Sequence, residues 1–397
     1  MLHDDRMQAS PPSPQEKSKP LLVIAGEASG DLHGAEILKA LKAARPDLRV
    51  IGIGGAAMSP FIDRKLADVK DLGVVGFCEG SKHLPDLLRL KKEIFRAIEE
   101  EGVGNALLID YQSFNLNLAK SIRKKKIPVG LHQYVCPQVW AWKAGRIPTL
   151  AQTLDTLYCL FDFEPALFKD TKLEAVWVGN PLVEAVKPER DREAFFAETG
   201  LDPARPLVAL LPGSRAAEVR RLLPAMAGLV RRWSRDPARS AIQWVLPVAS
   251  TLDPSVFAHE LEGLPVCLVE GRTYAARAHA DAALVCSGTA TLETALLGTP
   301  MAVLYRLSPL TYALARRIVK LPRFGLVNVV AGKDIATELL QGEVNPERLG
   351  QELSRLLDPA VAGPMRAALG EVRAHLGKPG AAERVAEHLA SRLAMKS

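Results

Sequence analysis

The sequence predicts an α/β fold built from two similar halves. Short apolar runs alternate with amphipathic helical stretches along the 397 residues, which is typical of parallel βαβ units. The runs form two series, because residues 183–205 between them are polar and contain Pro188 and Pro203. The first series of expected strands lies near residues 21–25, 49–53, 106–110, 127–131 and 154–160, and the second near 207–211, 242–247, 265–269, 282–286 and 301–305. We therefore expect two Rossmann-like domains that face a central cleft, with ligands bound outside the carboxyl ends of the strands.

The composition limits the classes of protein to which the chain can belong. With 48% hydrophobic and 24% charged residues, it reads as a globular protein with a large core. No segment has the roughly 20 uninterrupted apolar residues of a membrane-spanning helix. Five cysteines, at positions 78, 136, 159, 267 and 286, form no Cys-x-x-Cys pair, so we expect neither a zinc site nor a disulfide framework, and a reducing cytoplasm fits best. Residues 1–19 lack the apolar stretch of a signal peptide and are expected to form a disordered leader.

The net charge of +6 and a pI near 9.0 favour an anionic partner, such as nucleic acid, an anionic bilayer or a phosphorylated substrate. Basic residues gather at Arg89, Lys91, Lys92, Arg96, Arg316, Arg317, Lys320 and Arg323, and a solvated helix face is the alternative for each group. Residues 72–90 combine apolar positions with cations, which suits a membrane interface or acyl chains, and equally suits a partly buried helix with a charged outer face. The basic run at 123–126 fits the C-terminus of a helix, where cations complement the dipole.

The first expected strand leads into a loop, Gly-Glu-Ala-Ser-Gly-Asp at residues 26–31, and then into a helix from about Leu32. Such a loop allows close approach to a ligand. Its glycine spacing does not match the dinucleotide fingerprint Gly-x-Gly-x-x-Gly, and no acidic residue closes the next strand, so a nicotinamide cofactor is disfavoured. No phosphate-binding Gly-x-x-x-x-Gly-Lys-Ser/Thr loop occurs, which disfavours an ATP site. Ser29 and Asp31 have an alternative role as helix caps.

A carboxylate, Asp110, stands at the expected carboxyl end of a strand, just before the helix that Asn115 helps to open. There it is placed to act as a general base toward a substrate hydroxyl, with helix capping as the alternative. His132, expected to end the next strand, and His33 are reserve candidates.

Two turns in the second half suit a diphosphate linked to a ribose. Pro-Gly-Ser-Arg at residues 212–215 places Arg215 to clamp phosphate oxygens with its fork of donors. Cys-Ser-Gly-Thr-Ala-Thr-Leu-Glu at residues 286–293 ends a strand and starts a helix, so unpaired N–H groups and the helix dipole attract anionic oxygens. Glu293 lies one helical turn beyond Thr289 and can accept hydrogen bonds from both ribose hydroxyls. For each turn, an ordinary helix cap is the alternative.

Residues 134–146 place two tryptophans, Trp140 and Trp142, beside a proline and two cations. This pattern suits a surface for a sugar and phosphate, and it also suits packing in a core or between domains. No Asp-x-Asp pair occurs in the chain, so a glycosyl transfer would have to stabilise its diphosphate leaving group with Arg215 and helix N-termini.

Seven segments, taken in order, resemble the lipid-A-disaccharide synthase family. They are residues 25–31, 109–115, 134–142, 178–181, 211–215, 287–293 and 326–328, and the match spans roughly residues 20–345. The resemblance implies a GT-B glycosyltransferase in which the second lobe holds most of the UDP-sugar and the first lobe holds the acceptor. The implied reaction transfers diacylglucosamine from UDP to diacylglucosamine 1-phosphate, forming a β-1,6 linkage.

The resemblance also assigns roles to individual residues. It implies that Asp110 is the base for the 6-hydroxyl of the acceptor. The residues expected to bind the nucleotide sugar are Gly213, Ser214, Arg215, Ser287, Gly288, Thr289, Ala290, Thr291, Glu293 and Asn328. The residues expected to line the cleft near the reacting sugar are Gly26, Glu27, Ser29, Gly30, Asp31 and Asn115. We expect no metal and no cofactor, since the UDP-sugar is a substrate.

The expected domains are a leader (1–19), an acceptor-binding domain (20–182), a UDP-sugar-binding domain (183–360) and C-terminal helices (361–397). Packing of these helices on the first domain is one arrangement seen in GT-B proteins. The resemblance implies a cytoplasmic protein attached peripherally to the inner membrane, which gives the stretch at 72–96 a purpose. We expect no nucleic-acid partner, and a homodimer is left open.

The chain departs from the family pattern at several positions: Ser113 replaces an acid, Asn180 replaces a histidine, and Cys136 and Gln138 replace serines. A role that needs two acids near Asp110 is therefore in doubt, and Asn180 cannot carry a proton. Two rival functions use the same two-lobed plan, a UDP-N-acetylglucosamine 2-epimerase and a non-catalytic solute-binding protein. The missing secretory signal and the acid at a strand end count against the solute-binding protein.

Overall fold

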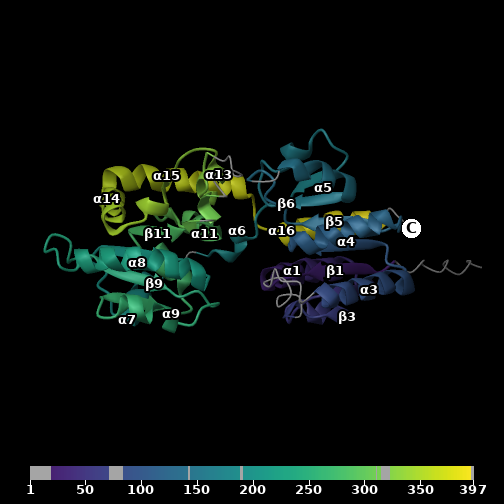
Figure 1. Ribbon diagram of the computed structural model, residues 1–397, viewed down its shortest axis with the longest axis horizontal. Helices are drawn as coiled ribbons and strands as arrows, with labels where there is room; N and C mark the ends of the chain where they lie inside the picture. Colours follow the sequence, from purple (N-terminus) through teal and green to yellow (C-terminus); the bar gives the residue numbers. More distant parts are fainter. Residues whose placement is uncertain are drawn as a thin grey trace, which may run out of the picture.

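Each half of the chain forms one parallel β-sheet with helices on both faces, and the two halves lie side by side along the longest axis of the molecule (Figure 1). The computed structural model describes residues 19–70, 84–141, 144–187, 191–309, 311–313 and 322–394. Within these ranges, the two sheets correspond to the two series of strands in the sequence.

The first sheet has seven parallel strands within the described ranges. In spatial order they are β3 (Arg64–Ala67), β2 (Val50–Ile53), β1 (Leu21–Ala25), β4 (Asn105–Ile109), β5 (Gly130–Tyr134), β6 (Thr156–Cys159) and β7 (Glu174–Trp177). The order reverses between β1 and β4, where Ala25 pairs with Ile109 at the carboxyl ends. A reversal of this kind leaves a crevice beside the strand ends, which is where open α/β sheets bind their ligands.

Alternate side chains of the central strand supply two separate cores. Leu21, Val23 and Ala25 pack toward α1 (Ala28–Ala44) and α16 (Ala381–Ala394). Leu22 and Ile24 belong to the core on the other face, with α3 (Leu84–Glu101), α4 (Gln112–Lys124) and α5 (Ile147–Thr153). The period of two along a strand thus explains why this continuously apolar segment is buried on both faces.

The second sheet has six parallel strands within the described ranges. Their spatial order is β10 (Val266–Val269), β9 (Gln243–Pro247), β8 (Leu207–Leu211), β11 (Ala282–Cys286), β12 (Met301–Tyr305) and β13 (Thr337–Leu340). Here the order reverses between β8 and β11, and Leu211 pairs with Val285 next to that point. The α-helices of this half that lie fully within the described ranges are α7 (Arg192–Thr199), α8 (Ala216–Trp233), α9 (Ser255–Leu261), α10 (Thr273–Ala278), α11 (Thr289–Leu296), α13 (Leu326–Ala331), α14 (Pro346–Leu356) and α15 (Pro359–Leu376).

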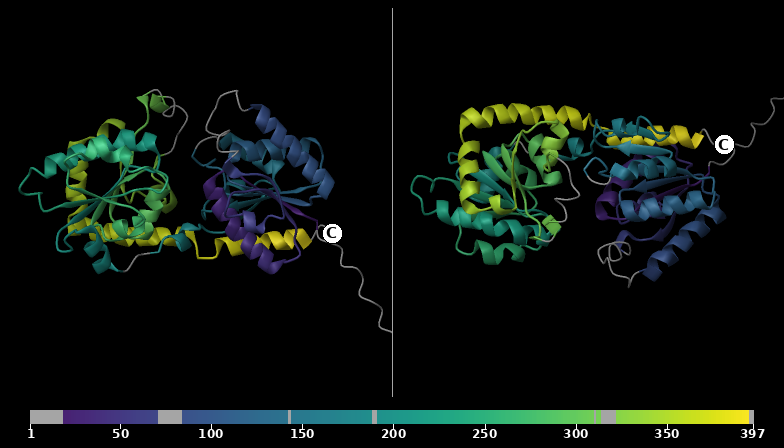
Figure 2. Two further views of the ribbon diagram at one scale, coloured as in Figure 1. Left: turned by 90° about the horizontal axis from the view of Figure 1, so that it is seen from below. Right: turned by 45° about the horizontal axis from the view of Figure 1, so that its top comes forward.

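The end of the chain returns to the first half. Helix α15 lies along the second half and α16 lies against α1 of the first (Figure 2). Val385, Ala386 and Leu389 are buried in the core that α1 and α16 form with the first sheet. Tyr158 Oη lies 3.1 Å from His388 Nδ1. The short helix α6 (Leu182–Ala185) lies on the segment that leads from the first sheet to the second. Just before it, the backbone N–H of Asn180 donates to the carbonyl of Leu376 at the end of α15.

Several sequence predictions need correction. Strand β5 begins three residues later than the expected run at 127–131, and β3, β7 and β13 were not predicted. Residues 183–205 do more than connect the lobes, because α7 buries Phe195 and Phe196 in the hydrophobic core of the second half. Helix α1 begins at Ala28 rather than near Leu32, so the β1–α1 turn is shorter than the expected loop.

Candidate active site

The carboxylate of Asp110 lies at the reversal point of the first sheet, immediately after β4. Asp110 and Tyr111 both adopt left-handed backbone conformations, with φ of 47° and 37°, which are uncommon for residues other than glycine. The side-chain amide of Asn115 holds this turn by donating to the carbonyls of Ile109 (3.2 Å) and Asp110 (2.9 Å). Asn115 is itself fully buried, so it fixes the backbone of Asp110 from the protein interior.

The surroundings of Asp110 favour its protonated form. Burial raises the pKa of this carboxyl above its usual range, and the nearby charge of Glu27 raises it further, while the backbone N–H of Tyr111 acts in the opposite direction. A raised pKa brings a carboxylate closer to the proton affinity that a general base needs near neutral pH. The position and the environment of Asp110 therefore both suit general-base chemistry.

The other cleft residues expected in the first lobe fall into two groups. Glu27 and Ser29 are exposed at the start of α1, while Gly26 is buried in the turn and Gly30 is buried in the first turn of α1. Asp31 is buried and accepts hydrogen bonds from three backbone N–H groups, those of Gly55, Ala57 and Met58. Its carboxylate therefore fixes the loop after β2.

The second lobe contains a pocket of about 1120 Å³ at the reversal point of its sheet, large enough for a nucleotide sugar. Eight of the residues expected to bind the nucleotide sugar line it: Gly213, Ser214, Arg215, Ser287, Gly288, Thr289, Ala290 and Glu293. The two turns therefore form one continuous wall, although about 75 residues separate them in the sequence.

The turn after β8 is organised by Glu218. Its carboxylate accepts from the backbone N–H groups of Ser214 (3.1 Å) and Arg215 (3.3 Å), and it pairs with the Arg215 guanidinium at 3.3 Å. Gly213 has φ of 120°, and a Cβ there would lie 2.4 Å from a carboxylate oxygen of Glu218, so only glycine fits. The Arg215 side chain is 73% exposed and remains accessible to a ligand.

The turn after β11 presents the N-terminus of α11 to the same pocket. Gly288 has φ of 146° and precedes the first residue of the helix, Thr289. The first N–H groups of a helix have no partner inside it, so they remain available to anionic oxygens. The Ser287 hydroxyl donates to the carbonyl of Phe324, and the buried Thr291 hydroxyl donates to the carbonyl of Gly288. Thr291 thus supports the turn from inside.

Glu293 is held in the pocket by a buried cation that the sequence reasoning missed. The Arg277 guanidinium forms an ion pair with the Glu293 carboxylate, and Arg277 is only 7% exposed. The Tyr274 hydroxyl donates to the other carboxylate oxygen at 3.4 Å. Arg277 lies on α10, and no motif surrounds it in the sequence.

Asn328 does not line the pocket. Its side-chain amide donates to the Ala336 carbonyl (2.7 Å) and to the Glu338 carboxylate (2.8 Å), and its oxygen accepts from the N–H groups of Ile335 and Ala336. Glu338 also accepts from the N–H groups of Phe324 and Gly325, and the Phe324 carbonyl accepts from the Ser287 hydroxyl. Asn328 is therefore linked through Glu338 to the segment that Ser287 contacts.

Asp110 lies outside this pocket, because it belongs to the other lobe. Lys187, on the connection between the sheets, is the lining residue closest in sequence to the first lobe. The structure therefore brings together eight of the ten residues expected to bind the nucleotide sugar, without Thr291 and Asn328, and it separately brings together Asp110, Glu27 and Gly26.

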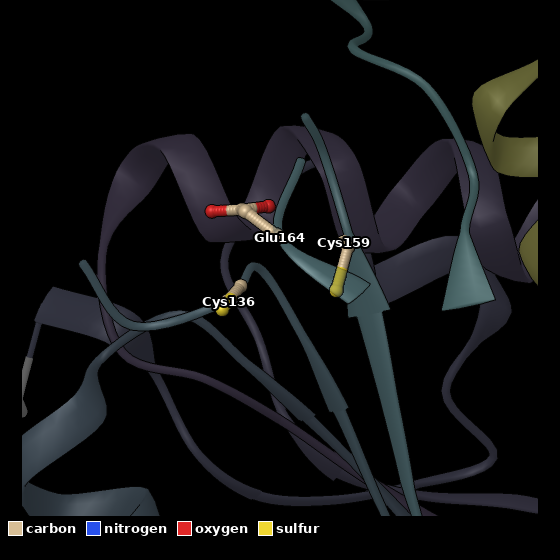
Figure 3. A group of neighbouring side chains, drawn as sticks. All are labelled: Cys136, Cys159 and Glu164. Atoms are coloured by element: carbon tan, nitrogen blue, oxygen red, sulfur yellow. The ribbon is translucent and has the colours of Figure 1, made fainter. Parts of the chain in front are cut away.

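A cluster of two thiols and a carboxyl lies behind the ends of β5 and β6 (Figure 3). The ligand-type atoms of Cys136, Cys159 and Glu164 all lie within 4.8 Å of one another, and all three residues are buried. Both carboxylate oxygens of Glu164 already accept hydrogen bonds, one from the Trp140 indole (3.2 Å) and one from the N–H groups of Leu160 (2.9 Å) and Phe161 (3.1 Å). These bonds account for the carboxyl as a structural group, and we assign no metal to it.

Trp140 packs edge to face against Phe161 and Phe163, as the packing alternative predicted for this residue. Trp142 lies outside the described residues. The two reserve histidines have structural surroundings as well. His132 lies inside β5 rather than at its end, with Nε2 3.0 Å from Asn105 Oδ1, and His33 packs edge to face on Tyr134, where burial lowers the pKa of its imidazole.

Part of the expected membrane-binding stretch, residues 71–83, lies outside the described residues. Its continuation is α3, which exposes half of the Leu88 side chain beside exposed Arg89 and Lys92. None of the helices in the described part of the chain is long and apolar enough to cross a bilayer.

The overall architecture is that of a GT-B protein, with two Rossmann-like lobes. The putative UDP-N-acetylglucosamine 2-epimerase from Listeria monocytogenes superposes with a TM-score of 0.63 at 15% identity, covering 96% of this chain and 98% of that one. Acinetobacter baumannii MurG superposes with a TM-score of 0.56 at 14% identity, covering 94% and 99%. At these identities the likeness establishes the fold.

The sequence comparisons establish the family. The family model described as Lipid-A-disaccharide synthetase matches residues 21–363, and the chain belongs to this family of glycosyltransferases. The lipid-A-disaccharide synthase of Myxococcus xanthus is 40% identical over 370 residues, which is 92% of this chain and 96% of the relative. That of Syntrophus aciditrophicus is 41% identical over 373 residues, or 93% and 96%. The resemblance in the sequence motifs is thereby confirmed.

Proposed function

We propose that the protein condenses UDP-2,3-diacylglucosamine with 2,3-diacylglucosamine 1-phosphate, giving a β-1,6-linked disaccharide 1-phosphate and UDP. The observation that carries this proposal is the chemistry at the two sheet reversal points. One has a carboxyl with a raised pKa, and the other has a pocket with an accessible guanidinium and a helix N-terminus. A base and an anion site are what a transfer from a nucleotide sugar to a hydroxyl requires.

The donor binds in the pocket of the second lobe. Its diphosphate contacts Arg215, the adjacent Gly213 and Ser214, and the turn from Ser287 to Ala290. Glu293 accepts hydrogen bonds from the ribose hydroxyls, and its ion pair with Arg277 keeps the carboxylate oriented. Thr291 and Asn328 act through the backbone segments that they hold.

The acceptor binds to the first lobe, with its 6-hydroxyl beside Asp110. Asp110 takes the hydroxyl proton, the oxygen attacks the anomeric carbon, and the bond from that carbon to the diphosphate oxygen breaks with both electrons leaving on UDP. Attack from the face opposite UDP inverts the anomeric centre and gives the β linkage. The exposed residues Glu27 and Ser29 lie beside the bound acceptor, and the buried Gly26 and Gly30 support them from the protein side.

The departing diphosphate is stabilised without a bound divalent cation. Arg215 offers a fixed fork of donors, and the N-terminal N–H groups of α11 point to the same pocket. Such preorganised donors stabilise charge that develops in the transition state. The absence of an Asp-x-Asp pair from the sequence agrees with this arrangement.

Catalysis also requires the lobes to approach each other, since Asp110 and the pocket belong to different sheets. Lys187 lies on one connection, and Gly377 and Gly380, both with positive φ, lie on the other between α15 and α16. Closure around both substrates would exclude water from the reacting atoms. We place the enzyme on the cytoplasmic face of the inner membrane, where the exposed basic residues of α3 attract anionic lipid.

The decisive experiment is incubation with UDP-diacylglucosamine, with and without the phosphorylated acceptor, followed by mass analysis. We expect the disaccharide only when both are present. Asp110→Asn should lower turnover about 10²-fold or more while UDP affinity is kept, and Asp170→Asn, an exposed acid of the same lobe, serves as the control. Isomerisation of the UDP-sugar without acceptor would instead identify an epimerase, a function found on the same fold.

A further inference from the structure

A small groove lies between α4 and α5, beginning next to Asp110. Its volume is about 210 Å³, below the roughly 300–1,000 Å³ of pockets that enclose a whole ligand. The lining residues are Gln112, Ser113, Leu116, Asn117, Lys120, Arg146 and Thr149. The groove therefore suits one chemical group of a larger substrate.

The charge in this groove has one sign. Among the described lining residues, Lys120 and Arg146 are charged and none is acidic, and neither cation forms an ion pair with another described residue. Because the two cations come from different segments of the chain and line the same groove, an anion bound there could contact both. A guanidinium and an ammonium together are the groups that proteins commonly use to bind phosphate.

A third cation sets the orientation of a neighbouring amide. The Lys91 ammonium donates to Asn117 Oδ1 at 3.0 Å and to the Ser121 hydroxyl at 2.6 Å. Lys91 holds the Asn117 amide by its oxygen. The N–H₂ group of the same amide is therefore the part that can donate hydrogen bonds to a ligand. With the hydroxyls of Ser113 and Thr149, the lining can donate several hydrogen bonds to one anion.

The groove follows a single face of α4. Ser113, Asn117 and Lys120 are spaced by four and three residues, so they lie along one side of the helix. Helix α4 begins at Gln112, two residues after Asp110, and a rise of 1.5 Å per residue puts Lys120 about 12 Å further along. A sugar with its hydroxyl at Asp110 can therefore direct a substituent from the opposite side of its ring into the groove.

We propose that the groove binds the phosphomonoester of the acceptor, with Lys120 and Arg146 as its main contacts. This inference rests on the proposed function and adds to it the part of the chain that selects a phosphorylated acceptor over an unphosphorylated one. Lys120 and Arg146 are thus residues that determine specificity, and Asp110 keeps its separate role.

The test compares two acceptors, diacylglucosamine with and without its 1-phosphate. In the wild type, we expect kcat/KM to be higher for the phosphorylated acceptor. Lys120→Gln and Arg146→Gln should each lower that value about 10- to 100-fold, the usual effect of losing one charge-assisted hydrogen bond, and should leave the unphosphorylated acceptor unaffected. Lys124→Gln, an exposed cation of α4 outside the groove, should change neither value.

Equal losses for both acceptors, or no loss, would overturn the proposal. Reduced binding to vesicles of anionic lipid together with unchanged acceptor selectivity would assign these cations to the membrane instead. Binding of glucosamine 1-phosphate, measured by NMR titration of the wild type and Arg146→Gln, does not depend on turnover. If the wild type transfers no sugar, the proposed function fails, and this titration still decides whether the groove binds a sugar phosphate.

Discussion

The ring of Tyr111 occupies the space that a side chain on Gly26 would need. A Cβ on Gly26 would lie 2.2 Å from Tyr111 Cγ and 2.6 Å from its Cβ, distances that no adjustment of a flexible side-chain end can relieve. Because Tyr111 follows Asp110 directly, this contact joins the β1–α1 turn to the turn that carries the proposed base.

Gly26→Ala should therefore displace Tyr111 and with it Asp110. We expect kcat to fall at least about tenfold, because a small misplacement of a reacting group is costly, while UDP affinity stays unchanged. Gly370→Ala is a matched control, since a Cβ there meets nothing within 4 Å and its helix tolerates alanine. Steady-state kinetics and UDP titration of both variants measure the effect. Wild-type turnover in Gly26→Ala would show that the contact is unimportant for catalysis.

The charge of Glu27 should contribute to the position of the acidic limb of the pH profile. Burial raises the pKa of Asp110 and Glu27 raises it further, so Glu27→Gln should lower that pKa and keep the base ionised at lower pH. The acidic limb of kcat/KM should then move to lower pH. Glu36→Gln, an exposed acid of α1, should leave the profile in place. A shift to higher pH, or none, would separate Glu27 from the titration of the base.

Glu293 should distinguish UDP from 2′-deoxy-UDP. If its carboxylate accepts from the ribose hydroxyls, the wild type binds UDP more tightly, and Glu293→Gln reduces this preference about tenfold. Arg277→Met should act in the same direction, because it removes the ion-pair partner of Glu293. Calorimetric titration with both nucleotides measures the preference. Glu371→Gln, whose exposed ion pair with Lys333 lies elsewhere, is the control, and an unchanged preference in Glu293→Gln would remove the ribose from its role.

The sequence was informative wherever a function depends on neighbours along the chain. The turns at 212–215 and 286–293 were recognised because each combines a strand end, small residues and a helix start. The central strands were recognised for the same reason, since burial on both faces makes them continuously apolar. The edge strands β3 and β7 were not predicted, because their residues are partly exposed and do not form a continuous apolar run.

Contacts between distant segments were not predictable. Arg277 on α10 and Glu293 on α11 form an ion pair although the strands before these helices, β10 and β11, are separated by β9 and β8 in the sheet, and nothing in the sequence near Arg277 marks it. Asn328 was expected at the nucleotide, and its side chain instead bonds to Glu338 and to the backbone of Ile335 and Ala336. The cysteine spacing gave no sign that Cys136 and Cys159 approach each other, because parallel strands bring together residues that a whole βαβ unit separates.

Glu164 should make the stability of the protein depend on pH. Burial raises the pKa of this carboxyl to about 7 in the folded protein, from an ordinary value of 4.5, although its hydrogen bonds from N–H donors oppose the shift. Below pH 4.5 the carboxyl is protonated in both states, so its contribution to stability is fully present. As the pH rises from 4.5 to 7, the unfolded chain ionises first and the folded state loses stability, by a total of about 3 kcal/mol.

Glu164→Gln cannot ionise, so its free energy of unfolding should rise relative to the wild type by this amount across that range. A constant offset from the altered hydrogen bonds adds to this change. Urea unfolding of both proteins at several pH values, with the exposed Glu36→Gln as control, measures the difference. A difference that stays constant with pH, or that falls as pH rises, would show that Glu164 is ionised in the folded protein at neutral pH.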